Sequence, residues 1–496
     1  MITARPPENL EGNDLFSKGG PRMSSRFLRS TAALALSVGA AVAVTAAPAG
    51  AAVTRFTPGA PGAGDPYFPD MGNGGYDVAH YDVDLAYDPA SKGIRAVTTI
   101  DATATQNLSR FDLDFLGPLR ISSLTVDGRA ATWDRTGAQE LRITPRSGLR
   151  AHHRFRVRVA YAGVPQTVDD PALGVSGWVP TADGGVMLNQ PTGAATVYPV
   201  NDTPADKATY TFTLTAPKDL TTLANGEPLG AATRHGLTTT RWAMRSPMAS
   251  ELAMIAIGKY DVVRTKARGR ANITATDRAM AITPENAKAF NTQTADVVAF
   301  LESNFGRYPF ASTGGIVVKA GVGYALETQG RPVYDLGRRP GSIPAGDLLA
   351  HELAHQWFGD AVSPAKWADI WLNEGFATYA EWLYAEKYQG VPVRQSFDKV
   401  YATPADDDLW NAKTADPGRD GIFDATVYDR GAMTLQALRE AIGDRAFFRL
   451  LREWPARYGG GNASTADFIR FAERISGRDL DRLFTTWLYT PSKPKL

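Results

Sequence analysis

The sequence contains no cysteine among its 496 residues, and it has only six histidines. The absence of cysteine excludes disulfide bonds, thiolate catalysis and cysteine-ligated zinc. An excess of one charge is also lacking, because 53 Lys and Arg oppose 52 Asp and Glu and leave a net charge of +1. A chain without a basic excess does not fit a protein that neutralises many phosphates, so we expect no nucleic-acid partner. Any metal ion must be bound by histidine and carboxylate side chains.

Long hydrophobic runs are missing from most of the chain, and the composition of 44% hydrophobic and 21% charged residues is that of a globular protein. One apolar stretch, residues 32–46, follows Arg26 and Arg29 and precedes a small-residue cleavage pattern at residues 49–51. This order predicts a secretory signal peptide rather than a membrane anchor, with Met23 as the translation start. We therefore expect a secreted, extracellular protein with no stable membrane insertion after cleavage.

The rest of the chain divides by the period of its hydrophobic pattern. Apolar and polar residues alternate through residues 76–265, which predicts an N-terminal antiparallel, β-sandwich-like domain. Helical patterns dominate residues 266–490, which form the expected catalytic domain. The leader with the signal peptide occupies residues 1–51. A lead-in loop rich in Pro and Gly covers residues 52–75, and a short tail covers residues 491–496. The fold class is multidomain α+β.

Start and stop signals place the helices of the second domain. Thr283 and Pro284 mark one start, and Gly359 and Gly390 mark two ends. The predicted helices cover residues 284–305, 344–358, 372–388, 431–442, 444–452, 464–475 and 480–488.

Two of the six histidines, His351 and His355, lie four residues apart in a His-Glu-x-x-His pattern. On a helix both imidazoles face the same way, and Glu352 between them can act on a water molecule as a general base. Glu374 lies 19 positions after His355 on the next predicted helix and is the candidate third ligand. We predict one zinc ion held by these two histidines and Glu374, with water in the fourth position. Spacing alone also permits cobalt or manganese.

The segments His351–Gly359 and Trp371–Ala377 closely resemble the M1 zinc metallopeptidases, the family of aminopeptidase N and leukotriene A4 hydrolase. Gly323–Glu327 is similar to the exopeptidase motif of that family, and Val427–Gly431 to the segment that carries its transition-state tyrosine. Further similarity lies in the N-terminal domain and near the predicted helix end at residue 305, in residues 201–209, 247–248 and 305–310.

The resemblance implies a thermolysin-like catalytic domain and a role for each matching residue. Glu352 would be the general base and Tyr428 the donor to the oxyanion. Glu327 would recognise the substrate's free α-amine, with Ala325 and Gln190 as further substrate-binding residues. The sequence departs from the family pattern in the exopeptidase motif, where Thr328 follows the glutamate in place of asparagine. The chain resembles a short form of the family without the large C-terminal helical domain.

Three functions remain to be separated at this point. The first is a secreted zinc aminopeptidase that acts on peptides with a free N-terminus. The second is a zinc endopeptidase with the same ligand set, which would have no need of Glu327 as an amine anchor. The third, a non-catalytic binding protein on a peptidase scaffold, is disfavoured because Glu352 and all three candidate ligands are present. The sequence indicates no oligomeric state.

Overall fold

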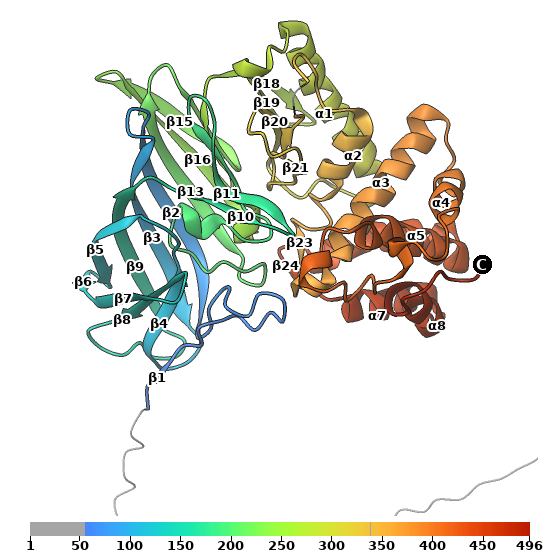
Figure 1. The fold of residues 1–496 in the computed structure, drawn as a ribbon, viewed down its shortest axis with the longest axis horizontal. Coiled ribbons are helices and arrows are strands. Elements are labelled where there is room, and N and C mark those ends of the chain that lie inside the picture. The colour runs from blue at the N-terminus through green and yellow to red at the C-terminus, as the bar shows by residue number, and fades with distance from the viewer. Residues whose placement is uncertain (1–54, 338) are drawn as a thin grey trace, which may run out of the picture. The chain divides into compact units, whose positions relative to one another are not determined.

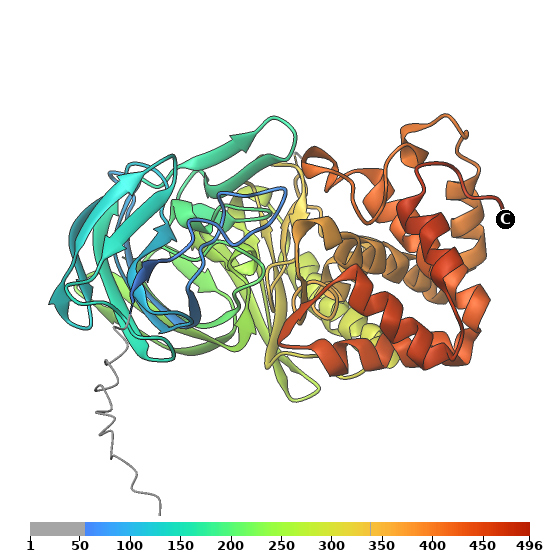
Figure 2. The same cartoon turned by 90° about the horizontal axis from the view of Figure 1, so that it is seen from below.

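A computed structural model describes residues 55–337 and 339–496. The predicted leader with its signal peptide, residues 1–51, lies outside the described residues. Strands come first along the chain, and helices gather in its C-terminal part (Figures 1 and 2). This arrangement confirms the predicted fold class of a β-rich N-terminal domain followed by a mostly helical domain.

An eight-stranded, mixed sheet forms the main layer of the N-terminal domain. Its order is β15 (Glu227–Arg234), β16 (Leu237–Met248), β13 (Ala208–Pro217), β2 (Tyr76–Asp88), β3 (Gly93–Ala104), β9 (Arg154–Gly163), β5 (Arg120–Val126) and β6 (Arg129–Ala130). All its neighbouring strands are antiparallel except β13 and β2, so the predicted antiparallel arrangement is found with one parallel pair in this sheet. A parallel pair needs a long crossover, and the chain between β2 and β13 provides one that contains most strands of the two smaller sheets.

Two smaller sheets complete the domain. One has the order β1 (Thr57–Pro58), β4 (Leu108–Asp114), β8 (Glu140–Thr144) and β7 (Thr132–Thr136). The other has the order β10 (Thr167–Asp170), β11 (Gly174–Pro180), β12 (Gly185–Leu188), β17 (Ile255–Gly258) and β14 (Thr221–Ala224).

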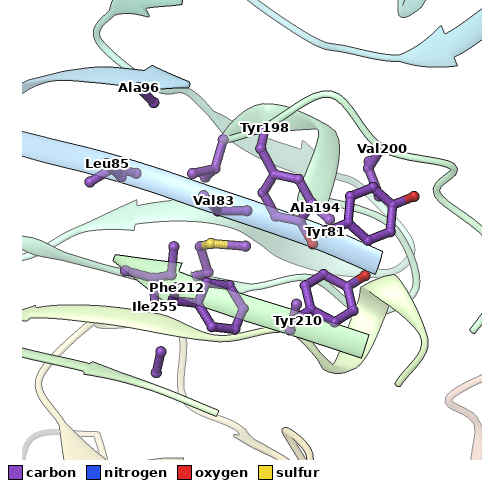
Figure 3. Packing of buried hydrophobic residues seen from close by; sticks show 14 of the residues in the cluster. Tyr81, Val83, Leu85, Ala96, Ala194, Tyr198, Val200, Tyr210, Phe212 and Ile255 are labelled. Carbon is purple, nitrogen blue, oxygen red and sulfur yellow. The ribbon is translucent and has the colours of Figure 1, made fainter. Parts of the chain in front are cut away.

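The core of the N-terminal domain lies between the large sheet and its neighbours. Along β2, Val83 and Leu85 are fully buried whereas Asp84 between them is exposed, as a period of two requires. Figure 3 shows Tyr81 of β2 beside Tyr210 of β13, and their rings stack with centroids 4.9 Å apart. Ile255 of β17 reaches the same cluster from the five-stranded sheet. The apolar face of the large sheet is therefore covered by β17 and the segments around it.

A fourth sheet begins the second domain, with the order β18 (Tyr260–Ala267), β19 (Arg270–Asp277), β20 (Ser312–Val318), β22 (Val333–Asp335) and β21 (Ala325–Leu326). The boundary drawn from the sequence at residue 265 falls inside β18. Since β18 pairs with β19 along its whole length, both strands belong with the domain that follows. The short strands β23 (Val362–Pro364) and β24 (Gly461–Ala463) pair in parallel.

Eight α-helices are assigned within the described residues. They are α1 (Pro284–Phe305), α2 (Gly346–Ala354), α3 (Trp371–Gln389), α4 (Val393–Tyr401), α5 (Ala425–Ile442), α6 (Asp444–Tyr458), α7 (Thr465–Ser476) and α8 (Asp481–Phe484). Thr283 caps α1 by accepting a hydrogen bond from the backbone of Asn286, and Gly390 ends α3 with a φ of 71°, as their sequence signals predict. Among residues 55–337 and 339–496, no helix is long and apolar enough to cross a bilayer.

Two predicted helix boundaries are wrong for tertiary reasons. Helix α2 ends at Ala354 rather than residue 358, because the chain turns and Asp360 N donates to His355 O at 2.9 Å. Helix α5 starts at Ala425 rather than at Gly431. Gly431 is no helix boundary: it packs against Gly375 of α3, where an added Cβ would lie 2.9 Å from backbone atoms. Its lack of a side chain allows α3 and α5 to approach closely.

Three further differences concern the helices near the C-terminus. Helix α4 was not predicted from the sequence. Helix α6 continues to Tyr458 past Pro455, beyond the predicted end at residue 452. The last predicted helix is the single turn α8 followed by a π-helical turn over Thr485–Tyr489.

Candidate active site

The three candidate metal ligands converge on one point between α2 and α3. His351 Nε2 lies 3.3 Å from Glu374 Oε2, and His355 Nε2 lies 3.4 Å from the same oxygen. His351 belongs to α2, His355 follows its last residue in a helical conformation, and Glu374 lies in the first turn of α3. All three residues are at most 8% exposed. The structure thus brings together the side chains that the sequence assigned to the metal.

The spacing of these atoms fits a zinc ion. Two ligand atoms bound at about 2.0–2.1 Å to a tetrahedral ion lie about 3.3 Å apart. The separations of 3.3 and 3.4 Å from Glu374 to the two imidazoles match that value. Two imidazole nitrogens and one carboxylate oxygen are also the donor set of a catalytic zinc site. The donor set of His351, His355 and Glu374 and its two measured separations therefore fit a zinc ion.

Each ligand imidazole is oriented through its second nitrogen. His351 Nδ1 is 2.6 Å from Glu381 Oε1, and His355 Nδ1 donates to the backbone oxygen of Phe358 at 3.1 Å. Both acceptors require a proton on Nδ1, so the lone pair of each ring is left on Nε2, which faces the metal position. Glu381 was not among the site residues predicted from the sequence. Its spacing was the available signal, because a residue seven positions after Glu374 lies on the same helix face.

Charge complementarity holds the ligand cluster together. Burial raises the pKa of Glu374, but the two imidazoles outweigh it and lower this pKa to about 2. Burial lowers the pKa of His355, whereas Glu327 and Glu374 raise it to about 9. In the same way, Glu374 and Glu381 overcome burial and raise the pKa of His351 well above its usual value. The cluster therefore favours bound positive charge, which either protons or a divalent cation can supply. Because an imidazole must be neutral to bind a metal ion, binding of the cation displaces the protons of the cluster.

Glu352 is buried beside the ligands without being one of the converging three. Burial raises its pKa to about 8, against the opposing effect of His351 and His355. The Glu352 carboxylate lies close to the Glu327 carboxylate and the His355 imidazole, since one ligand atom from each of the three lies within 4.8 Å of the others. A carboxylate whose pKa lies near neutrality can accept a proton and return it, as a general base must.

Tyr428 approaches the site from α5. Its ring is parallel to that of His351 within 12°, with centroids 5.9 Å apart. The close approach of Gly431 to Gly375 brings this part of α5 next to the start of α3. Burial and the surrounding carboxylates, led by Glu374, raise the pKa of Tyr428 well above its usual value. The hydroxyl therefore keeps its proton and can donate a hydrogen bond at the metal site.

Glu327 lies directly after β21 and is joined to the N-terminal domain. Gln190, which follows β12, donates from Nε2 to Glu327 Oε1 at 2.6 Å. Gln356, in the turn after α2, donates to the backbone oxygen of Glu327 at 3.1 Å. Glu327 is only 3% exposed. Ala325 lies two residues earlier in β21, pairs with Tyr334 of β22 and is partly buried; its contact with substrate stays a prediction.

The loop that carries Glu327 is held by its own hydrogen bonds. Asp335 in β22 accepts from the backbone nitrogens of Val322 and Gly323 at 2.6 and 3.1 Å. Thr328, which stands where the family pattern has asparagine, is fully buried, and its hydroxyl donates to Arg331 O at 2.6 Å. This residue supports the turn after Glu327 and points into the protein.

Comparisons with family models and known proteins agree with this geometry. The family model described as peptidase family M1 domain matches residues 344–487, and that of the peptidase M1 N-terminal domain matches residues 78–252. Mitochondrial aminopeptidase 2 of Saccharomyces cerevisiae is 28% identical over 326 residues, which are 60% of this chain and 33% of that protein. Glutamyl aminopeptidase of Sus scrofa is 28% identical over 331 residues, or 62% of this chain and 35% of that protein. The chain spans about a third of the length of these curated relatives.

Solved structures match over nearly their whole length. The M1 zinc metallopeptidase of Deinococcus radiodurans is 31% identical, with a TM-score of 0.79 and coverage of 88% of this chain and 98% of that one. A mutant of that enzyme bound to a Tyr-Ser-Ala substrate gives 31% identity and a TM-score of 0.78, covering 88% of this chain and 99% of that chain. The likeness therefore includes both domains.

Proposed function

Because this chain belongs to the M1 peptidase family, we propose that it is a zinc-dependent aminopeptidase that hydrolyses N-terminal residues from peptides. The observation that carries the proposal is the combination of a metal-ligand cluster with a buried carboxylate aimed at the same place. His351, His355 and Glu374 would hold the zinc ion, and Glu327 lies within reach of that cluster through His355 and Glu352.

Peptide hydrolysis needs a nucleophile, a proton carrier and a group that stabilises negative charge. A bound zinc ion supplies Lewis-acid chemistry that makes water more acidic and polarises a carbonyl group. Glu352 takes the proton of the attacking water and delivers it to the leaving amine. Tyr428 donates its hydroxyl proton in a hydrogen bond to the oxyanion of the tetrahedral intermediate.

An aminopeptidase must also recognise the end of its substrate. A free α-amine has a pKa of about 8 and is largely cationic at neutral pH. Glu327 provides the complementary negative charge. The hydrogen bond from Gln190 occupies Oε1 of this carboxylate and leaves Oε2 for the amine. One end of the substrate is thereby fixed, and the first peptide bond is placed at the metal.

The experiment compares aminoacyl anilides with free and with acetylated amines, and measures zinc in the same sample. We expect cleavage of the free-amine substrates only, and loss of activity when zinc is removed by a chelator. Glu327→Gln should lower kcat/KM for free amines by about 10–100-fold, because a charged hydrogen bond contributes about 1.5–3 kcal/mol. Glu453→Gln is the matched control, since that glutamate is exposed and paired with Arg449 on α6.

Equal cleavage of free and acetylated substrates would favour the alternative, an endopeptidase with the same ligands. Full activity after removal of the metal would contradict both versions of the proposal.

We also propose export. The support is the order of a basic segment, the apolar stretch 32–46 and the cleavage pattern at 49–51. Expression of the full chain in a bacterial host followed by mass spectrometry of the N-terminus should show a mature protein that begins near Ala52 outside the cytoplasm. Intact leader on cytoplasmic protein would contradict this part of the proposal.

A further inference from the structure

The side chain of one lysine from the N-terminal domain contacts the catalytic domain just after α2, the helix that carries His351. Lys207 lies immediately before β13, and its Nζ donates to the backbone oxygens of Asp360 at 2.7 Å, Ala361 at 3.1 Å and Gly461 at 3.3 Å. An ammonium group has three protons and no acceptor, so three carbonyl oxygens satisfy it completely. Lys207 is partly buried, and this burial lowers its pKa to about 8.

Two of those carbonyl groups belong to the turn that orients a metal ligand. Asp360 N donates to His355 O at 2.9 Å, and Ala361 N donates to Gln356 O at 3.2 Å. The same turn contains Phe358, whose backbone oxygen accepts the proton of His355 Nδ1. A shift of this turn would therefore move the acceptor that sets the rotation of the His355 ring.

The third carbonyl group ties the contact to a second element. Gly461 begins β24, which pairs with β23 directly after the turn (Figure 1). In the opposite direction, Asn462 of β24 donates from Nδ2 to Pro204 O at 2.6 Å and to Pro364 O at 3.0 Å. Lysine and asparagine thus form reciprocal links between residues 204–207 and the strands that follow the metal helix.

The segment that carries Lys207 is itself held to the N-terminal domain by buried hydrogen bonds. Asp206 accepts from Val78 N at 3.1 Å and from Asn201 Nδ2 at 2.5 Å. Asn201 in turn accepts from Asn73 N through its side-chain oxygen. Because these bonds anchor the segment to the large sheet, Lys207 can transmit the position of the sheet to the turn after α2.

We propose that Lys207 is a positioning residue for the metal site, supplied by the N-terminal domain. It fixes the turn Phe358–Ala361 and through it the orientation of the His355 imidazole. Groups that orient a metal-ligating histidine change metal affinity by about 10–100-fold when they are removed. Since Lys207 acts through the backbone rather than on the ring itself, we expect an effect at the lower end of that range.

The test measures zinc affinity of the purified protein by competition with a chromophoric chelator. Lys207→Met keeps the apolar stem and removes the donors, and it should raise the zinc Kd about tenfold. The matched control is Lys493→Met, because Lys493 Nζ also donates to a backbone oxygen, that of Thr403 at 2.9 Å, outside the contacts that hold the metal site. The control should leave the zinc Kd unchanged.

Thermal unfolding with and without zinc separates positioning from a general loss of stability. Zinc raises the midpoint by an amount that depends on its Kd, so this rise should shrink in Lys207→Met and persist in Lys493→Met. A purely structural lysine would lower both midpoints equally and leave the rise and the Kd unchanged, which would overturn the proposal. Where Lys207→Met does not fold, Lys207→Arg keeps the charge but changes the donor geometry, and unchanged zinc affinity there would be equally contradictory.

This inference rests on the proposed function only for the identity of the ion. Zinc binding is measured without substrate, so a protein that binds zinc but cleaves no peptide would contradict the proposed activity and leave the role of Lys207 intact.

Discussion

The site has a metal end, formed by His351, His355 and Glu374, and a proposed amine end, formed by Glu327 and Gln190. The two ends are built in different ways. The metal ligands come from two consecutive helices and the turn between them, and the three ligand residues span at most 23 positions in sequence. The amine end pairs Glu327 with Gln190, which lie 137 residues apart and in different domains. The metal end is therefore local in sequence, whereas the amine end exists only when the two domains are packed together. Substitutions at the two ends should accordingly change different kinetic parameters.

The largest effect is expected from Glu352→Gln. The amide retains the shape of the carboxylate but cannot accept the proton of the attacking water, so kcat should fall by about 10²–10⁴-fold. Zinc content should remain at one ion per chain, because Glu352 is not among the three converging ligands. Steady-state kinetics and metal analysis of one preparation test both statements. A variant that loses zinc together with activity would place Glu352 among the ligands instead.

Next in size is the effect of Tyr428→Phe. Removal of one donor to an oxyanion typically lowers kcat by about 10²–10³-fold. The substrate KM should change little, because the hydrogen bond strengthens in the transition state rather than in the bound substrate. Kinetics with a free-amine anilide provide the measurement. A raised KM at normal kcat would move Tyr428 from the metal end to substrate binding.

Glu381→Gln probes the metal end without touching the reaction. Because Glu381 Oε1 lies 2.6 Å from His351 Nδ1, the change weakens the bond that orients the ligand ring, and the zinc Kd should rise about tenfold. Preference for free over acetylated amines should stay as in the unaltered protein, since Glu327 and Gln190 are unaffected. Chelator competition and the anilide pair measure the two properties. Loss of amine preference at normal zinc affinity would contradict the separation of the two ends.

The same contrast explains what the sequence could predict. The two histidines and Glu374 follow helix periodicity and one chain reversal, so their convergence could be inferred from spacing. The alternation of apolar and polar residues along β2 likewise predicted a strand with one buried face. Glu381 could have been found by extending the helix periodicity by two turns. The contact of Lys207 with Asp360 spans 153 residues, and no local pattern indicates it.

The predictions of two helix boundaries were wrong for a related reason. Gly431 reads as a helix start signal or breaker in sequence, but in the structure it lies within α5 and allows close contact with Gly375. The turn after Ala354 is likewise set by hydrogen bonds back to His355 and by Lys207 from the other domain. In both places a tertiary contact decides the local structure, and propensity alone cannot register it.

The smallest effect is expected from Gln190→Ala. Because Gln190 orients the Glu327 carboxylate without replacing its charge, kcat/KM for free-amine anilides should fall only about fivefold, mainly through KM, which is less than the loss expected when the carboxylate itself is removed. Gln190 acts by orienting Glu327, so the effect should disappear when Gln190→Ala is combined with Glu327→Gln, a non-additivity that a double-mutant cycle measures directly. Zinc affinity should be unchanged in all three variants. Fully additive losses would mean that Gln190 contacts the substrate independently of Glu327, and the amine end would then have two separate anchors, one from each domain.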